Sequence, residues 1–136
     1  MSRRSRSREV ALQVLYQDDL NPGNNPGQAD QFLCARLRND VDLIGLARSL
    51  VSGVRRNRQE LDEMLGKIAD NWSLGRMAAT DRNVLRLGAY EILFFGTPDR
   101  VAINEAVELA KRFGSAHSAQ FVNGILDRFI AGHRKE

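Results

Sequence analysis

"DRNVLRLGAYEILFFG", residues 81–96, has the spacing of an amphipathic helix. Its apolar side chains recur every three or four positions, at Val84, Leu85, Leu87, Ile92 and Phe95. In a helix of 3.6 residues per turn, these positions share one side, which is expected to be buried. Thr80 is expected to cap this helix and Gly96 to end it.

The same periodicity continues on both sides of this segment. Helices are expected over residues 102–114 and 118–130 downstream, and over 4–20, 29–37, about 40–54 and 59–71 upstream. Trp72 is expected to anchor the core where the upstream and downstream halves join. Because no stretch alternates with the period of a strand, the sequence predicts an all-α fold without a sheet, a compact unit of two small bundles with about seven helices.

The 136 residues are enough for one domain, so residues 1–136 are interpreted as a single unit. Within it we expect a flexible basic arm over 1–8, an N-terminal helical half over 9–71 and a C-terminal half over 72–136. Asn123-Gly124 is a hairpin signal, but the apolar residues around it have helical spacing. A glycine inside a helix indicates close approach by another helix or by a ligand.

The basic charge is concentrated at the N-terminus. The net charge is only +3, yet residues 1–8 hold Arg3, Arg4, Arg6 and Arg8 and no acidic side chain. Arginine is suited to planar phosphate contacts and to stacking on bases. The pattern therefore favours an anionic partner for a flexible arm, with a solubilising tail as the alternative.

Catalytic and metal-binding patterns are not found. Cys34 is the only cysteine, and His117 and His133 are far from it, so neither a metal site, a cofactor site nor an enzyme is expected. The acidic pairs Asp18–Asp19 and Glu105–Glu108 are interpreted as solvated helix faces. Without a membrane-length apolar run or a secretory signal, we expect a cytoplasmic protein that does not bind membranes.

Several aromatic and polar side chains are candidates for a nucleic-acid surface. Tyr16 lies beside Gln13 on the first expected helix, and Phe113 and Phe121 flank a turn near the chain's end. Single-stranded RNA is held by stacking on aromatic and arginine side chains. The alternative for the two phenylalanines is an ordinary place in the core.

"SREVALQVLYQ" (7–17), "DRNVLRLGAYEIL" (81–93), "PDRVAINEAVELAKRFG" (98–114) and "FVNGILDRF" (121–129), with Trp72, resemble the NusB family of bacterial transcription antitermination factors. The resemblance implies an all-helical fold and binding of boxA RNA from ribosomal RNA leaders together with ribosomal protein S10 (NusE). It also implies action on the RNA polymerase elongation complex with other Nus factors. The expected RNA contacts are Arg4, Arg6, Arg8, Gln13, Tyr16, Lys111, Phe113 and Phe121. The expected S10 contacts are Asp81, Tyr90 and Glu91, with helix packing as the alternative for the last two.

The sequence departs from the family pattern at one corner. Ala116, His117 and Gln120 stand where family members usually carry acidic residues and a lysine, so the RNA contacts there are expected to differ. Two other functions remain open at this point: a helical protein–protein adaptor without a direct RNA role, and a stand-alone RNA-binding module related to the N-domains of ribosomal RNA methyltransferases.

Overall fold

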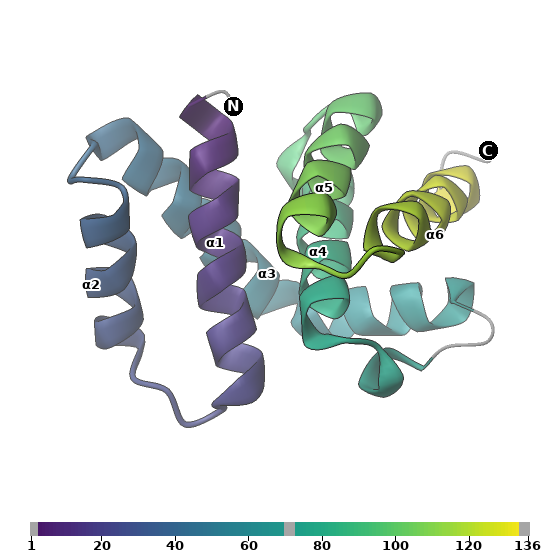
Figure 1. Ribbon diagram of the computed structural model, residues 1–136, viewed down its shortest axis with the longest axis horizontal. Helices are drawn as coiled ribbons and strands as arrows, with labels where there is room; N and C mark the ends of the chain where they lie inside the picture. The colour runs from purple at the N-terminus through teal and green to yellow at the C-terminus, as the bar shows by residue number, and fades with distance from the viewer. Residues whose placement is uncertain (1–2, 70–72, 134–136) are drawn as a thin grey trace.

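The computed structural model describes residues 3–69 and 73–133, and these form an all-helical fold without a strand (Figure 1). The helices are α1 (Arg3–Leu20), α2 (Pro26–Arg36), α3 (Val41–Ile68), α4 (Ala79–Tyr90), α5 (Asp99–Phe113) and α6 (Ser118–His133). A short 3₁₀ turn, η1 (Leu74–Arg76), precedes α4, and a π-helical segment, η2 (Glu91–Phe95), follows it. The all-α prediction is confirmed. Trp72 and the expected boundary after residue 71 lie outside the described residues.

The described residues form six α-helices, not the seven expected, because α3 is one helix of 28 residues. Asp40 caps it by accepting hydrogen bonds from the backbone N–H groups of Asp42 and Leu43. The polar stretch after Val54 was expected to be a break. Instead, Arg55 and Arg58 continue the helix and form ion pairs with acidic residues of α1.

The two groups of helices share one core. Figure 1 shows α1, α2 and the start of α3 on one side, α4, α5 and α6 on the other, and α3 running behind both groups. Buried apolar side chains from all six helices form a single cluster, with Leu50, Leu61, Leu85, Leu126 and Phe129 among the most enclosed. At about 25 cal/mol per Å² of buried apolar surface, this cluster supplies most of the free energy that holds the helices together.

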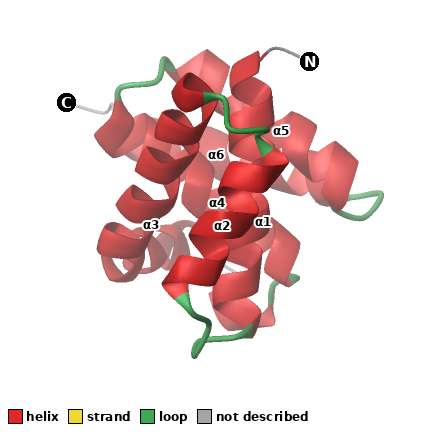
Figure 2. Cartoon of the chain, turned by 90° about the vertical axis from the view of Figure 1, so that its left-hand side faces the viewer, coloured by secondary structure: helices red, strands yellow, loops and turns green. Residues whose placement is uncertain are grey.

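Helix α2 begins earlier than its apolar spacing indicates. It starts at Pro26 rather than near residue 29, because the Asn25 side chain accepts a hydrogen bond from Gly27 N–H at 2.8 Å and proline suits the first helical position. Leu33 is its one fully buried residue. Figure 2 shows α2 at the surface in front of α1, where its exposed residues can form one wall of a groove.

The N-terminus is a correction to the expected arm. Residues 3–8 are not a flexible arm but the first turns of α1, while residues 1–2 lie outside the described part of the chain. Ser7 is fully buried and donates a hydrogen bond to the carbonyl of Leu43 at 2.8 Å. Ser5 and Ser7 are both buried, so the helical register places the arginines that alternate with them on different faces.

Two glycines had expected roles, Gly96 and Gly124, and the structure shows a third with a role of its own, Gly53. Gly96 has φ of 75° and ends η2, as expected of a helix-terminating glycine. Gly124 lies inside α6, so the hairpin signal is correctly overruled, but the close approach of another helix is not present: within the described residues, no atom outside the adjoining turns of α6 lies within 4 Å of its Cβ position. The close approach occurs at Gly53 instead, where a Cβ would meet the Tyr90 ring.

Asp19 joins three helices rather than facing solvent. Its carboxylate accepts hydrogen bonds from Arg82 at 2.7 Å and from Asn83 at 2.9 Å, and it also pairs with Arg58 and Arg86. Burial disfavours the charged carboxylate, but the hydrogen bonds and the arginine charges outweigh burial and lower the pKa of Asp19 below its usual value. The interpretation of this acid as a solvated face is therefore wrong.

The lowered pKa of Asp19 predicts a loss of stability in acid. A carboxyl whose pKa is lower when folded stabilises the protein above about pH 4, and this stabilisation disappears as pH falls through the folded pKa. We expect Asp19→Asn to lower the free energy of unfolding by about 1–2 kcal/mol at pH 7. In urea titrations, the free energy of unfolding of this variant should also fall less steeply below about pH 4 than that of the parent. Asp127→Asn, at an exposed site on α6, is the control. An acid limb of unchanged steepness in Asp19→Asn would contradict this assignment.

Candidate nucleic-acid interface

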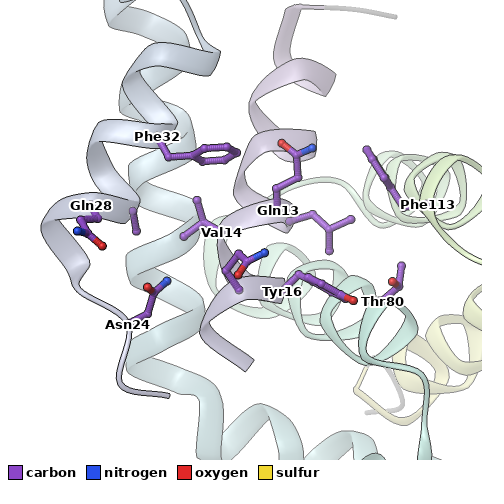
Figure 3. Close-up of a pocket in the computed structure, with 11 residues that line it drawn as sticks. Gln13, Val14, Tyr16, Asn24, Gln28, Phe32, Thr80 and Phe113 are labelled. Atoms are coloured by element: carbon purple, nitrogen blue, oxygen red, sulfur yellow. The ribbon is translucent and has the colours of Figure 1, made fainter. Parts of the chain in front are cut away.

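A groove of about 550 Å³ runs along α1, between α2 and the end of α5. Gln13 and Tyr16 of α1 and Phe113 of α5, three of the expected RNA contacts, line it together. Figure 3 shows Phe32 of α2 and Phe113 on opposite sides of Gln13, with Tyr16 lower in the groove and directed toward Thr80. The walls therefore carry aromatic rings and the floor carries amide and hydroxyl groups.

Each aromatic wall carries an arginine. The guanidinium carbon of Arg36 lies 5.8 Å from the centre of the Phe32 ring, and that of Arg112 lies 5.6 Å from the centre of the Phe113 ring. Phe32 is 41% exposed, so its ring is accessible to a partner that enters the groove. Rings flanked by arginines can stack on bases while the cations approach phosphates.

The expected arginine contacts are divided by the helical register of α1. Arg6 lies on the same face as Gln13 and forms an ion pair with Glu9 at 3.6 Å. Arg4 is exposed, but it lines a different hollow, with Phe95 and Val101. These arginines therefore do not act as one cluster, as an arm would.

Arg8 is buried, contrary to its expected role as an exposed RNA contact. Its guanidinium donates to both carboxylate oxygens of Glu91 at 2.8–3.0 Å and to Glu105 at 3.0 Å. Burial opposes its charge, but the hydrogen bonds and charges of Glu91 and Glu105 raise the pKa of Arg8 above its usual range. Ser5 and Thr97 also donate hydrogen bonds to these carboxylates. The geometry is that of a structural ion pair.

The expected S10 contacts do not share one surface. Glu91 is enclosed with Arg8, and Tyr90 is buried against Gly53, so the structure supports the alternative of helix packing for both. Asp81 is half-buried in the first turn of α4 and lines a hollow of about 300 Å³ with Phe121 and His117. Within the described residues, its Oδ1 atom accepts no hydrogen bond.

The two other expected RNA contacts lie away from the groove. Lys111 is exposed on α5 and lies 3.5 Å from Glu108, one turn earlier on the same helix. Phe121 lines the Asp81 hollow rather than the aromatic groove. The corner of Ala116, His117 and Gln120 is close to this second hollow, since His117 forms part of its lining.

Sequence analysis did not identify the α2 wall of the groove: the helix expected over 29–37 contains Phe32 but begins after Gln28, and its apolar spacing does not show that Phe32 faces α1. Three residues spaced four apart line this side of the groove: Phe32 and Gln28 of α2, and Asn24 just before the helix. The signal that could have found two of them is Asn25-Pro26, a capping residue followed by proline at the first helical position. Thr80 also lines the groove and does not cap α4, which begins at Ala79 without a side-chain cap.

The described residues lack two other kinds of feature. They hold no group of three or more His, Cys, Asp and Glu side chains that could bind a metal ion. Among the helices of that part of the chain, none combines the length and the apolar character needed to cross a bilayer.

Comparison with known proteins gives concordant matches in sequence and in structure. The model of the NusB family matches residues 5–131. A transcription antitermination protein NusB of Anaeromyxobacter dehalogenans is 44% identical over 131 residues, which cover 96% of this chain and 92% of the relative. A solved structure of T. maritima NusB is 37% identical with a TM-score of 0.83, covering 95% of this chain and 90% of that one. A structure of antitermination factors NusB and NusE in complex with dsRNA is 29% identical with a TM-score of 0.86, covering 97% and 98%.

Proposed function

This chain belongs to the NusB family, and from that membership we propose that it acts in transcription antitermination by binding boxA RNA together with NusE, ribosomal protein S10. It is a transcription factor and not an enzyme, as its relatives are transcription antitermination proteins. The NusB chain bound with NusE and dsRNA is similar over almost its whole length, which supports both partners.

The observation that carries RNA binding is the groove along α1. Gln13 and Tyr16 of α1 meet Phe113 of α5 there, and Arg36 and Arg112 stand over its aromatic walls. We assign the groove to splayed bases of single-stranded RNA, with Phe32 as an additional stacking residue. Arg6, on the groove face of α1, is proposed as a phosphate contact beside it; Arg4 and Lys111 are proposed as phosphate contacts farther from the groove, and Phe121 as a contact at the Asp81 hollow.

Binding of a boxA RNA oligonucleotide, with and without NusE, tests this function. We expect Tyr16→Ala and Phe32→Ala each to weaken binding about tenfold, since stacking on one aromatic side chain contributes about 1–3 kcal/mol per base. Tyr16→Phe is the matched control and should retain most of the affinity. Fluorescence anisotropy at fixed salt gives the comparison. If both alanine variants bind the RNA with the affinity of the parent, the RNA does not bind in this groove.

The proposed NusE surface includes Asp81. Asp81 is half-buried at the start of α4 and lines the hollow beside His117, and NusE, as an RNA-binding ribosomal protein, is expected to be basic. We expect Asp81→Lys to slow association with NusE about tenfold at low salt, while the melting temperature is retained, because charge at an interface rim acts mainly on the association rate. Stopped-flow or surface-binding kinetics measure it. Equal rates for parent and variant at low salt would exclude Asp81 from the interface.

The assembly is proposed to extend beyond these two partners. With RNA and NusE bound, the protein joins the RNA polymerase elongation complex with other Nus factors in the cytoplasm and promotes processive transcription. The expectation comes from the family resemblance. Reconstituted elongation complexes, with this protein present or omitted, test it by the fraction of transcripts that pass a terminator.

A further inference from the structure

Two arginines from different helices converge on one buried carboxylate. Arg6 of α1 lies 3.6 Å from Glu9 Oε1, and Arg112 of α5 lies 3.4 Å from the same atom. The Glu9 side chain is only 2% exposed, whereas the side chains of Arg6 and Arg112 are 40% and 51% exposed. The carboxylate is thus inside the protein, and both guanidinium groups reach solvent above it.

This cluster differs from the ion pair of Arg8. Glu91 uses both carboxylate oxygens in direct hydrogen bonds of 2.8–3.0 Å to Arg8. Glu9 is held at longer distances through one oxygen, and its Oε2 atom accepts no hydrogen bond from the described residues. Two cations share one anion here, so the cluster carries an excess positive charge that favours a further anion.

The cluster lies at the end of the aromatic groove. Positions 6, 9 and 13 share one face of α1, and Gln13 lines the groove. Arg112 stands over the ring of Phe113, which forms the α5 wall. Figure 1 shows α1 and α5 side by side along this stretch. A nucleic acid whose bases enter the groove would therefore bring its backbone past both guanidinium groups.

We propose that Arg6 and Arg112 form a clamp for one phosphodiester phosphate of single-stranded RNA, and that Glu9 is the positioning residue that holds them together. The proposal rests on the RNA-binding function proposed above and adds Arg112 and Glu9 to it. A phosphate offers two terminal oxygens, and guanidinium groups donate parallel hydrogen bonds to such oxygens. Without Glu9, the two guanidinium groups would repel each other and separate.

Replacement of Glu9 by glutamine separates positioning from simple electrostatics. If Glu9 were only a nearby negative charge, removing it would strengthen binding of a polyanion. If Glu9 holds the two arginines, Glu9→Gln weakens binding, because both guanidinium groups then lose the carboxylate that holds them beside each other. The two roles predict changes of opposite sign.

The experiment is a salt titration of boxA RNA binding in the presence of NusE. The proteins are the parent, Glu9→Gln, Arg112→Gln, the double variant, and Arg56→Gln as a control that removes an exposed positive charge on α3. We expect Glu9→Gln and Arg112→Gln each to weaken binding three- to tenfold. Arg112→Gln should reduce the slope of log affinity against log salt by about 0.7, the value for one phosphate contact on a single strand. The double variant should bind no more weakly than Arg112→Gln alone.

Each other result overturns the proposal. Tighter or equal binding by Glu9→Gln would leave Glu9 as a structural or merely repulsive charge. An unchanged slope in Arg112→Gln, measured well below the melting temperature of that variant, would argue against the clamp even if Glu9→Gln fails to fold. If the parent itself does not bind the RNA, the proposed function fails, whereas parent binding with unaffected variants rejects the clamp alone.

Discussion

Arg8→Ala is expected to lower the free energy of unfolding by about 3–5 kcal/mol, the typical loss when one partner of a buried ion pair is removed. The alanine leaves Glu91 enclosed without its bidentate partner and removes a donor from Glu105. In a chain of this length, the loss corresponds to a fall in melting temperature of roughly 10–18 °C. Urea denaturation and thermal melting measure it.

Arg4→Ala, one helical turn earlier at an exposed position, is the matched control and should change stability by less than about 0.5 kcal/mol. The double variant Arg8→Met/Glu91→Met should regain part of the loss, since it removes both charges together. Well below its melting temperature, Arg8→Ala should keep the parent's salt slope for RNA. If the slope of log affinity against log salt falls by about 0.7 while stability is retained, Arg8 contacts the RNA and is not a structural residue.

Gly53→Ala is expected to lower the free energy of unfolding by about 3 kcal/mol, which is the upper end of the range for a methyl group added to a filled core. A Cβ at this position would lie 2.1 Å from the Tyr90 ring, which is itself buried. Helices α3 and α4 must therefore separate, or the ring must leave its place. Thermal melting of the purified variant gives the result.

Gly124→Ala provides the comparison for Gly53→Ala. It adds the same methyl group to an exposed helical position with open space around it, so stability should rise by up to about 1 kcal/mol. Tyr90→Leu in the Gly53→Ala background should recover part of the loss by removing the clashing atoms. Equal melting temperatures for the two alanine variants would show that α3 and α4 are not held as closely as the structure has them.

Much of the fold could be predicted because the spacing of apolar residues along a helix identifies its buried face from the local sequence. The periodic positions of residues 81–96 are buried as expected at Val84, Leu85, Leu87 and Ile92. The sequence did not predict that α4 continues into the π-helical segment η2 in its last turn. Apolar spacing alone does not distinguish a helical turn of this kind from an ordinary one.

The errors concern residues whose role depends on distant partners. Arg8 has the same local setting as Arg4 and Arg6, and only the position of Glu91 on another helix makes it structural. Gly53 and Gly124 are both helix-interior glycines, and only the Tyr90 side chain distinguishes them. In the candidate site, the aromatic residues of α1 and α5 could be identified by type, whereas Phe32 required the position of α2 against α1.

The ion pair of Arg8 has a consequence for synthesis on the ribosome. Its two acidic partners follow it by 83 and 97 residues, so the first helix cannot neutralise its buried charge until most of the chain has been made. At 5–20 residues per second, this interval is roughly 5–20 s. During it the amino-terminal segment is an incomplete folding unit with an unshielded cation. The synthesis of α5, rather than the emergence of α1 alone, is then the event that permits the native assembly.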